Sequence, residues 1–209
     1  MIPPTEKQMT ILRSLALKGP GNIQEIQLRE GMNYPSTHRN VKFLRGRGLV
    51  WKSAVGDRGP KSPQTYSLTP FGVLYSMIFC NLWAETEHIV SIWSEVTPLF
   101  IKYWRRFDEA GLGDEFNAAA VNVYNDMMLF QRRFIDFRGK ENLLTVYRNS
   151  LDQYFLSVLC DGHTSAKLSD MAEIIRADSD YMAVWRKWYG VEKLKMDFLE
   201  TLNREIDAP

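Results

Sequence analysis

Residues 35–50, PSTHRNVKFLRGRGLV, decide the fold that we expect for the start of the chain. Pro35 suits the first turn of a helix, where its missing N–H costs nothing, and the glycines that follow end the helix near position 45. At 100° per residue, Thr37, Val41 and Leu44 fall on one side of this helix. That spacing predicts a buried stripe.

The opposite side of the same helix carries hydrogen-bond donors and cations. Arg39, Lys42 and Pro35 lie there, flanked by Ser36 and His38, and the segment contains no carboxylate. A helix that enters the major groove of DNA presents such a face, because Arg can bond a guanine edge twice and Lys or Ser can bond bases or phosphates. A helix side that is only solvated fits the same pattern, so both interpretations stay open.

Two helices are expected before this one. Thr5 can cap the first, which ends at the glycines of residues 18–21. Asn22 followed by Glu25 resembles a capping box and predicts a second helix over residues 23–30, closed by a glycine. The side chains expected to face inward from the second helix are Ile23, Ile26 and Leu28.

A β-hairpin is expected after the third helix. Residues 49–55 favour a strand because they are rich in β-branched and aromatic side chains, and residues 65–68 supply the returning strand. Between them, residues 56–63 form a loop rich in Gly and Pro with two cations, Arg58 and Lys61. Three helices followed by a hairpin with a basic tip is the element order of a winged helix-turn-helix.

Three stretches taken together resemble a known family. LALKGPGNIQEI at 15–26, PSTHRNVKFLRGRGLV at 35–50 and TYSLTPFG at 65–72 are similar to the winged-helix domains of PadR and MarR-like transcriptional regulators. The resemblance covers about residues 8–72. It implies sequence-specific binding of double-stranded DNA, usually as a homodimer. The roughly 137 residues that follow are longer than the usual PadR tail, so the resemblance says little about them.

Seven residues of the first third then have expected roles in DNA binding. The third helix would place Ser36, His38, Arg39 and Lys42 in the groove. Arg58 and Lys61 would hold the hairpin against phosphates or a neighbouring minor groove, and Lys52 would touch the DNA backbone.

The net charge of +1 conceals two opposite parts. Residues 1–72 hold 11 Lys+Arg against 4 Asp+Glu, whereas residues 73–209 hold 15 against 21. Such asymmetry points to an anionic partner for the basic part. We expect a DNA-binding domain over 1–72, hereafter the head, and a dimerisation and sensing domain over 73–209, hereafter the body. The alternative is a winged-helix adaptor that recruits proteins through the acidic body.

The body is predicted to be helical nearly to its end, so the expected fold class is mainly α, a winged helix followed by a helical bundle. An apolar stripe over residues 74–99 predicts a long helix with a kink or break at Pro98. Two more helices are expected over 165–189 and 191–206, separated at Gly190.

Two heptad-like stripes lie between these helices. Over residues 116–137 apolar side chains recur every 3.5 residues for three heptads, and a second stripe covers 144–158. A dimer seam and the core of a self-contained bundle both fit, and short connections favour the bundle core for 116–137.

Residues for other chemistry are few. Cys160, His163, Cys80 and His88 match no common zinc spacing, and the cysteines are typical of buried helix residues. Aromatic content alone gives weak support to an effector pocket among five tryptophans: Trp83, Trp93, Trp104, Trp185 and Trp188. No phosphate-binding loop, zinc-protease motif or nucleophile elbow is present, so we expect no enzyme, metal or cofactor.

Localisation follows from similar signals. The two cysteines suit a reducing compartment, no leader pattern precedes the first helix, and the most apolar stretch is about half the length of a membrane helix. The sequence therefore predicts a cytoplasmic protein with no membrane partner.

Overall fold

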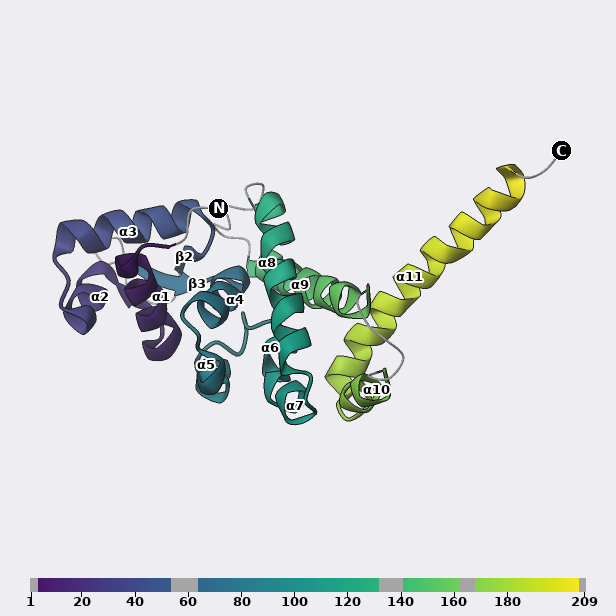
Figure 1. Cartoon of the computed structure of the whole chain (residues 1–209). Helices are drawn as coiled ribbons and strands as arrows, with labels where there is room; N and C mark the ends of the chain where they lie inside the picture. Colours follow the sequence, from purple (N-terminus) through teal and green to yellow (C-terminus); the bar gives the residue numbers. More distant parts are fainter. Residues whose placement is uncertain (1–3, 54–63, 132–140, 162–167, 207–209) are drawn as a thin grey trace.

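The computed structural model describes residues 4–53, 64–131, 141–161 and 168–206, and these are mainly helical (Figure 1). The first elements are α1 (Glu6–Lys18), β1 (Gly21–Asn22), α2 (Ile23–Glu30), α3 (Tyr34–Gly46), β2 (Val50–Ser53), β3 (Thr65–Leu68) and α4 (Pro70–Phe79). They are followed by the 3₁₀ turn η1 (Trp83–Glu85), α5 (Thr86–Ile92), α6 (Leu99–Lys102), α7 (Trp104–Glu109), α8 (Gly113–Gln131), α9 (Glu141–Asp161), α10 (Leu168–Arg176) and α11 (Ser179–Ile206). The expected mainly α class is confirmed.

The helices of the head begin where the sequence predicts. Thr5 caps α1 in a capping box with Gln8, whose backbone N–H donates to Thr5 Oγ1 over 3.4 Å. Asn22 caps α2 in the same way, and its Oδ1 accepts from the amide of Glu25 over 2.9 Å. These reciprocal bonds satisfy backbone donors that a helix start leaves free, so both boundaries are encoded locally.

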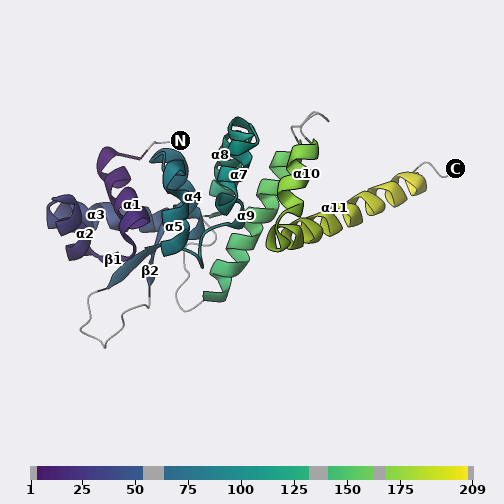
Figure 2. The same ribbon diagram turned by 90° about the horizontal axis from the view of Figure 1, so that it is seen from below.

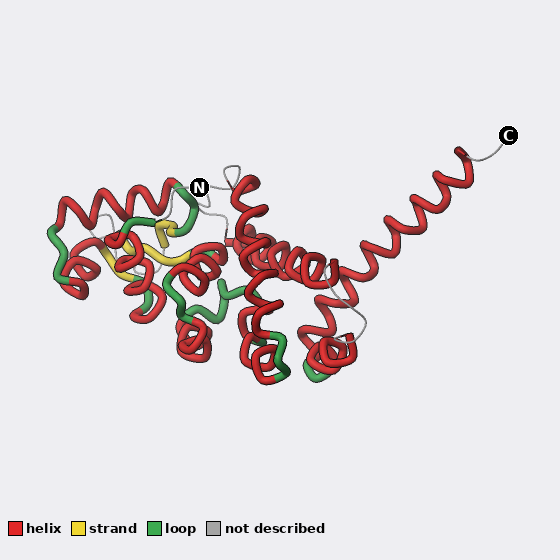
Figure 3. The backbone as a smooth tube through the Cα atoms, viewed as in Figure 1, coloured by secondary structure: helices red, strands yellow, loops and turns green. Residues whose placement is uncertain are grey.

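The three strands form one antiparallel sheet in the order β1–β3–β2, visible as the yellow segments of Figure 3. Val50 lies opposite Leu68 and Gly21 lies opposite Tyr66, so β3 is the central strand. The first hairpin strand, expected over residues 49–55, begins at Val50 and is described as far as Ser53, and residues 54–63 lie outside the described residues.

Head and body share one hydrophobic core. The buried apolar side chains of the described residues form a single cluster that includes members of both parts. Helix α4 links them, because it packs against α1 on one side and against α8 and α9 on the other. The expected domain boundary after residue 72 therefore falls inside a helix.

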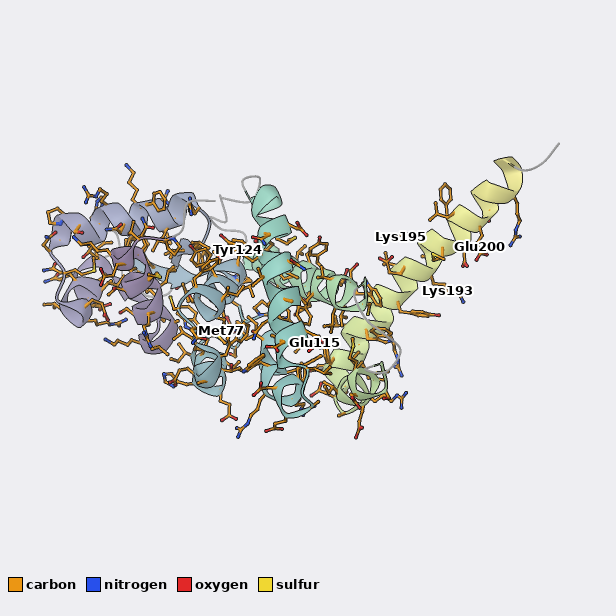
Figure 4. The ribbon with its side chains drawn as sticks, in the orientation of Figure 1. Met77, Glu115, Tyr124, Lys193, Lys195 and Glu200 are labelled. Atoms are coloured by element: carbon orange, nitrogen blue, oxygen red, sulfur yellow. The ribbon has the colours of Figure 1, made fainter. Side chains whose placement is uncertain are left out.

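A hub of aromatic rings holds the middle of the body. Phe116 of α8 is fully buried, and five rings surround it with centroid distances of 4.9 to 5.9 Å: Trp83, Phe100, Trp104, Phe107 and Phe155. Ala120 and Val123 continue the same buried stripe, and α8 packs on α9. The heptad-like spacing thus serves the core from Phe116 to Met127, and the side chains of its later positions lie outside the described residues. Tyr124, on the same helix, reaches toward α4, where it contacts Phe71 and Tyr75 (Figure 4).

Three expectations about the helices are wrong. The stripe over 74–99 is not one helix with a single break near Pro98, because the chain also turns after α4, where Asn81 adopts a φ of +50°. No break occurs at Gly190, since α11 runs through it, and the preceding helix ends at Arg176 instead. Leu28 does not face inward and is 72% exposed.

Candidate nucleic-acid interface

Helix α3 is held firmly against the head. The side chain of Asn33 accepts from the amide of Ser36 over 2.9 Å at the start of the helix, and Pro35 occupies its first turn. Thr37, Val41 and Leu44 are buried against α1 and α2, which confirms the predicted stripe. The opposite face of α3 is therefore presented outward on a rigid support.

That outward face is basic and partly aromatic. His38, Arg39 and Lys42 are exposed, and α3 contains no acidic residue. Within the described part of the chain, the side chains of Arg39 and Lys42 make no ion pair and no hydrogen bond. Both charges are thus available to an anionic ligand.

Two exposed aromatic side chains on α3 were not predicted as part of the face. Tyr34 is 52% exposed and stacks on His38 at a centroid distance of 6.2 Å, while Phe43 is 43% exposed and lies under the guanidinium of Arg47. Their positions next to the predicted cations on α3 could have revealed them. Flat rings beside cations suit contact with sugars and bases as well as phosphates.

Ser36 does not share the exposed face. It is 7% exposed, and its backbone carbonyl accepts from Asn40 Nδ2 over 2.9 Å. Asn40 Oδ1 in turn accepts from Gln8 Nε2 of α1 over 3.4 Å. Ser36 lies at the flank of the helical wheel, and α1 covers that flank, so the residue belongs to a buried polar bridge between α1 and α3.

Part of the positive charge of the head has a structural role. Lys18 forms an ion pair with Glu30 over 2.8 Å, and Arg29 donates to the carbonyl oxygens of Gly19 and Pro20 over 3.1 and 3.2 Å. These bonds join the end of α1 to α2. Lys18 and Arg29 therefore serve the packing of α1 against α2, whereas Arg39 and Lys42 of α3 have no such role among the described residues.

The sheet contributes less to the described surface. Lys52 is half-buried on β2 and lies opposite Tyr66 of β3. Burial raises the pKa of Tyr66, and the positive charge of Arg45 partly opposes this shift. The phenol stays neutral at physiological pH, so it gives Arg45 no counter-charge. The predicted hairpin cations Arg58 and Lys61 lie outside the described residues.

The other candidate sites are not assembled. Trp83 contacts Trp104 at 5.0 Å, Trp185 contacts Trp188 at 4.9 Å, and Trp93 instead bonds to the backbone of α1, so the five tryptophans make separate contacts.

No metal site is formed by the residues that the structure describes, which do not include His163. Cys80 and His88 are each bonded to backbone carbonyls of α1, at Met9 and Leu17 respectively. Among the described helices, none is long and apolar enough to cross a membrane.

Comparison with protein-family models, curated proteins and solved structures finds no match to this chain. The interpretation of the interface therefore depends on the chemistry of its own residues.

Proposed function

We propose that the protein is a DNA-binding transcriptional regulator with a winged helix-turn-helix head. In this proposal α3 reads the major groove, the β2–β3 hairpin contacts the backbone or a minor groove, and two copies bind together as a homodimer. The order of α1, α2, α3 and the hairpin supports it. The sequence resemblance to PadR and MarR-like regulators supports it as well.

The observation that carries the proposal is the outward face of α3. A recognition helix must be rigidly backed, free of carboxylates and lined with side chains that can reach base edges. Arg39 and Lys42 meet these conditions, because they are exposed and have no counter-charge on the described part of the chain. Arg39 is the proposed reader of a guanine edge, and Lys42 the proposed phosphate or base contact.

The body would lie away from the DNA in such a complex, because its excess of acidic residues is repelled by phosphates. Figures 1 and 2 are compatible with this arrangement, since α3 and α11 lie at opposite ends of the molecule. The second candidate remains an adaptor that recruits proteins through the acidic body, and exposed apolar side chains of the body, among them Val146 and Tyr189, support it.

The first experiment is selection of bound sequences from a random pool of duplex DNA, followed by fluorescence anisotropy with the selected duplex at several salt concentrations. We expect a palindromic site and an affinity that falls steeply as salt rises, because bound cations release counterions from DNA. No binding to any duplex at low salt would exclude the proposal and favour the adaptor.

A matched pair of arginine variants tests the reader. Arg39→Ala should weaken binding to the selected site by roughly 10- to 100-fold while leaving non-specific binding nearly unchanged. Arg105→Ala is the control, because Arg105 is also exposed but lies on α7, where it pairs with Glu87 and Glu109. An equal loss on specific and non-specific duplexes would make Arg39 a phosphate contact instead.

A further inference from the structure

The second half of α11 projects from the rest of the protein. Its first half packs against α9 and α10 and buries Tyr181 completely. From Gly190 onward the described side chains are exposed except for Glu192, which is half-buried. Figures 1 and 2 show this segment extending away from all other elements in both views.

The projecting segment is amphipathic, with its apolar side uncovered. Val191, Leu194 and Phe198 lie within about 60° of one another around the helix, and Leu199 borders them. Their exposed fractions are 43%, 70%, 65% and 55%. With Lys195 they line one shallow groove on the surface. Met196, also exposed at 57%, points to a different side, about 140° from Val191.

The projecting segment of α11 has little to stabilise it as a helix while its apolar side faces water. An isolated helix of this length is marginally stable, and most helical stability in proteins comes from packing an apolar face. A continuous exposed apolar patch is typical of an interaction surface. The face of Val191, Leu194 and Phe198 therefore indicates a partner.

The charges of α11 identify which partner fits. The helix carries five Lys or Arg and five Asp or Glu, so it has no net attraction for an anionic membrane or for nucleic acid. The charges are also sorted along the helix. Within the projecting segment, residues 190–195 hold two cations and one anion, and residues 196–206 hold three anions and one cation. Figure 4 labels Lys193 and Lys195 from the first group and Glu200 from the second.

We propose that the projecting half of α11 pairs in antiparallel orientation with the same helix of a second copy of this chain. In that arrangement the basic half of each helix lies beside the acidic half of the other, and the apolar faces cover each other. A parallel pair would place like charges together. The biological purpose of this dimer rests on the proposed function, since it would bring a second copy of α3 to the DNA. The evidence for the dimer itself comes from α11 alone.

The test is sedimentation equilibrium of the full chain without DNA. We expect a dimer in the micromolar range for the wild type. Leu194→Glu with Phe198→Glu should raise the dimer dissociation constant about a hundredfold or more, because two buried apolar side chains are lost and charge is placed in the contact. Met196→Glu is the control and should remain dimeric, since Met196 lies off the face.

Circular dichroism and thermal unfolding of the three proteins establish that the fold is retained, which we expect because neither variant touches the core. A wild type that stays monomeric throughout the micromolar range overturns the proposal. So does a Leu194→Glu, Phe198→Glu variant that is folded and dimerises like the wild type.

Charge reversal tests the orientation. Lys193→Glu with Lys195→Glu makes both halves acidic and should weaken an antiparallel dimer. Adding Asp197→Lys and Glu200→Lys exchanges the two halves and should restore it. An unchanged or tighter dimer after the first pair of substitutions overturns the antiparallel arrangement. The sedimentation measurement contains no DNA, so a protein that fails to bind duplex DNA can still confirm the α11 dimer. Conversely, a protein that fails to dimerise can still be tested for binding of a single copy to DNA.

Discussion

The indole Nε1 of Trp93, directly after α5, donates a hydrogen bond to the carbonyl oxygen of Ala16 in α1 over 3.0 Å. The carbonyl oxygen of Leu17 accepts from His88 Nε2 of α5 over 2.8 Å. Both carbonyls belong to the last turn of α1, which has no partners for them within the helix. Two side chains of the body thus cap a helix of the head.

Replacing Trp93 should weaken the whole fold rather than one part. Trp93→Phe leaves the buried carbonyl of Ala16 without a donor, which costs roughly 1 to 3 kcal/mol of unfolding free energy. Urea denaturation followed by circular dichroism should show one transition at a lower midpoint. Ser94→Ala, at an exposed neighbour, should stay within about 0.5 kcal/mol of the wild type. A two-step transition in Trp93→Phe would mean that head and body unfold separately.

The pH dependence of stability should carry the signature of one buried carboxyl group. Asp152 of α9 is 1% exposed, and its Oδ1 accepts from the amide of Phe100 in the first turn of α6 over 3.0 Å. Burial raises the pKa of Asp152 from 3.8 to about 7, although the backbone amides of α6 oppose the shift.

The folded state therefore binds more protons than the unfolded state between those two pKa values, and stability falls as pH rises through that range. Asp152→Asn keeps an acceptor for the amide of Phe100 and should flatten the dependence of unfolding free energy on pH. The loss of stability that it removes is at most roughly 4 kcal/mol. Thermal unfolding from about pH 4 to pH 8 measures the effect. Asp170→Asn, at an exposed carboxyl, should retain the wild-type slope, and an equally sloped Asp152→Asn profile would contradict the assignment.

Two glycines of the head should respond oppositely to alanine. A Cβ at Gly72 would overlap the carbonyl oxygen of Leu49, which belongs to backbone and cannot swing aside. We expect Gly72→Ala to cost about 3 kcal/mol or more. Gly46, at the end of α3, has no atom within 4 Å of its would-be Cβ, and Gly46→Ala should be neutral or stabilising by up to about 1 kcal/mol. Chemical denaturation measures the free energy of unfolding of both variants. A loss in Gly72→Ala alone indicates close packing at Gly72, whereas a loss in both would indicate that the head tolerates alanine poorly at either glycine.

Gly190 offers a corresponding test in the body. It lies inside α11 with open space around its Cβ position, so Gly190→Ala should stabilise the helix by about 1 kcal/mol and raise the ellipticity at the helical band. Gly31, which ends α2 with a φ of +61°, should behave differently. Gly31→Ala is expected to destabilise by about 1 kcal/mol, because an L side chain is strained in that conformation. A loss of stability in Gly190→Ala would argue against a continuous α11.

The parts of the fold that depend on adjacent residues could be predicted from the sequence. Thr5 and Asn22 mark helix starts through bonds to residues three positions later, and Pro35 marks a third through its own backbone. The buried stripe of Thr37, Val41 and Leu44 follows from the helical period in the same way. These signals require no knowledge of the rest of the chain.

The errors concern contacts made across the chain. Ser36 lies on the flank of α3, and only the position of α1 decides that this flank is covered. Similarly, nothing near Lys18 or Arg29 in the sequence shows that they are bonded at the junction of α1 and α2. The helix start at α11 was readable locally, since Asp178 Oδ1 accepts from the amide of Asp180 over 2.8 Å. A glycine inside a helix costs only about 1 kcal/mol, so Gly190 does not interrupt α11.

Because Trp93 and His88 of the body cap α1, we expect that the head cannot be moved into another protein on its own. A chimera that joins residues 1–72 to a foreign oligomerisation domain loses both donors and most of α4, and should be insoluble or unfolded. A graft extended through Lys102 retains both donors, α4 and α5. Engineering of the DNA specificity that we propose for α3 is therefore best done by changing its residues within the intact chain.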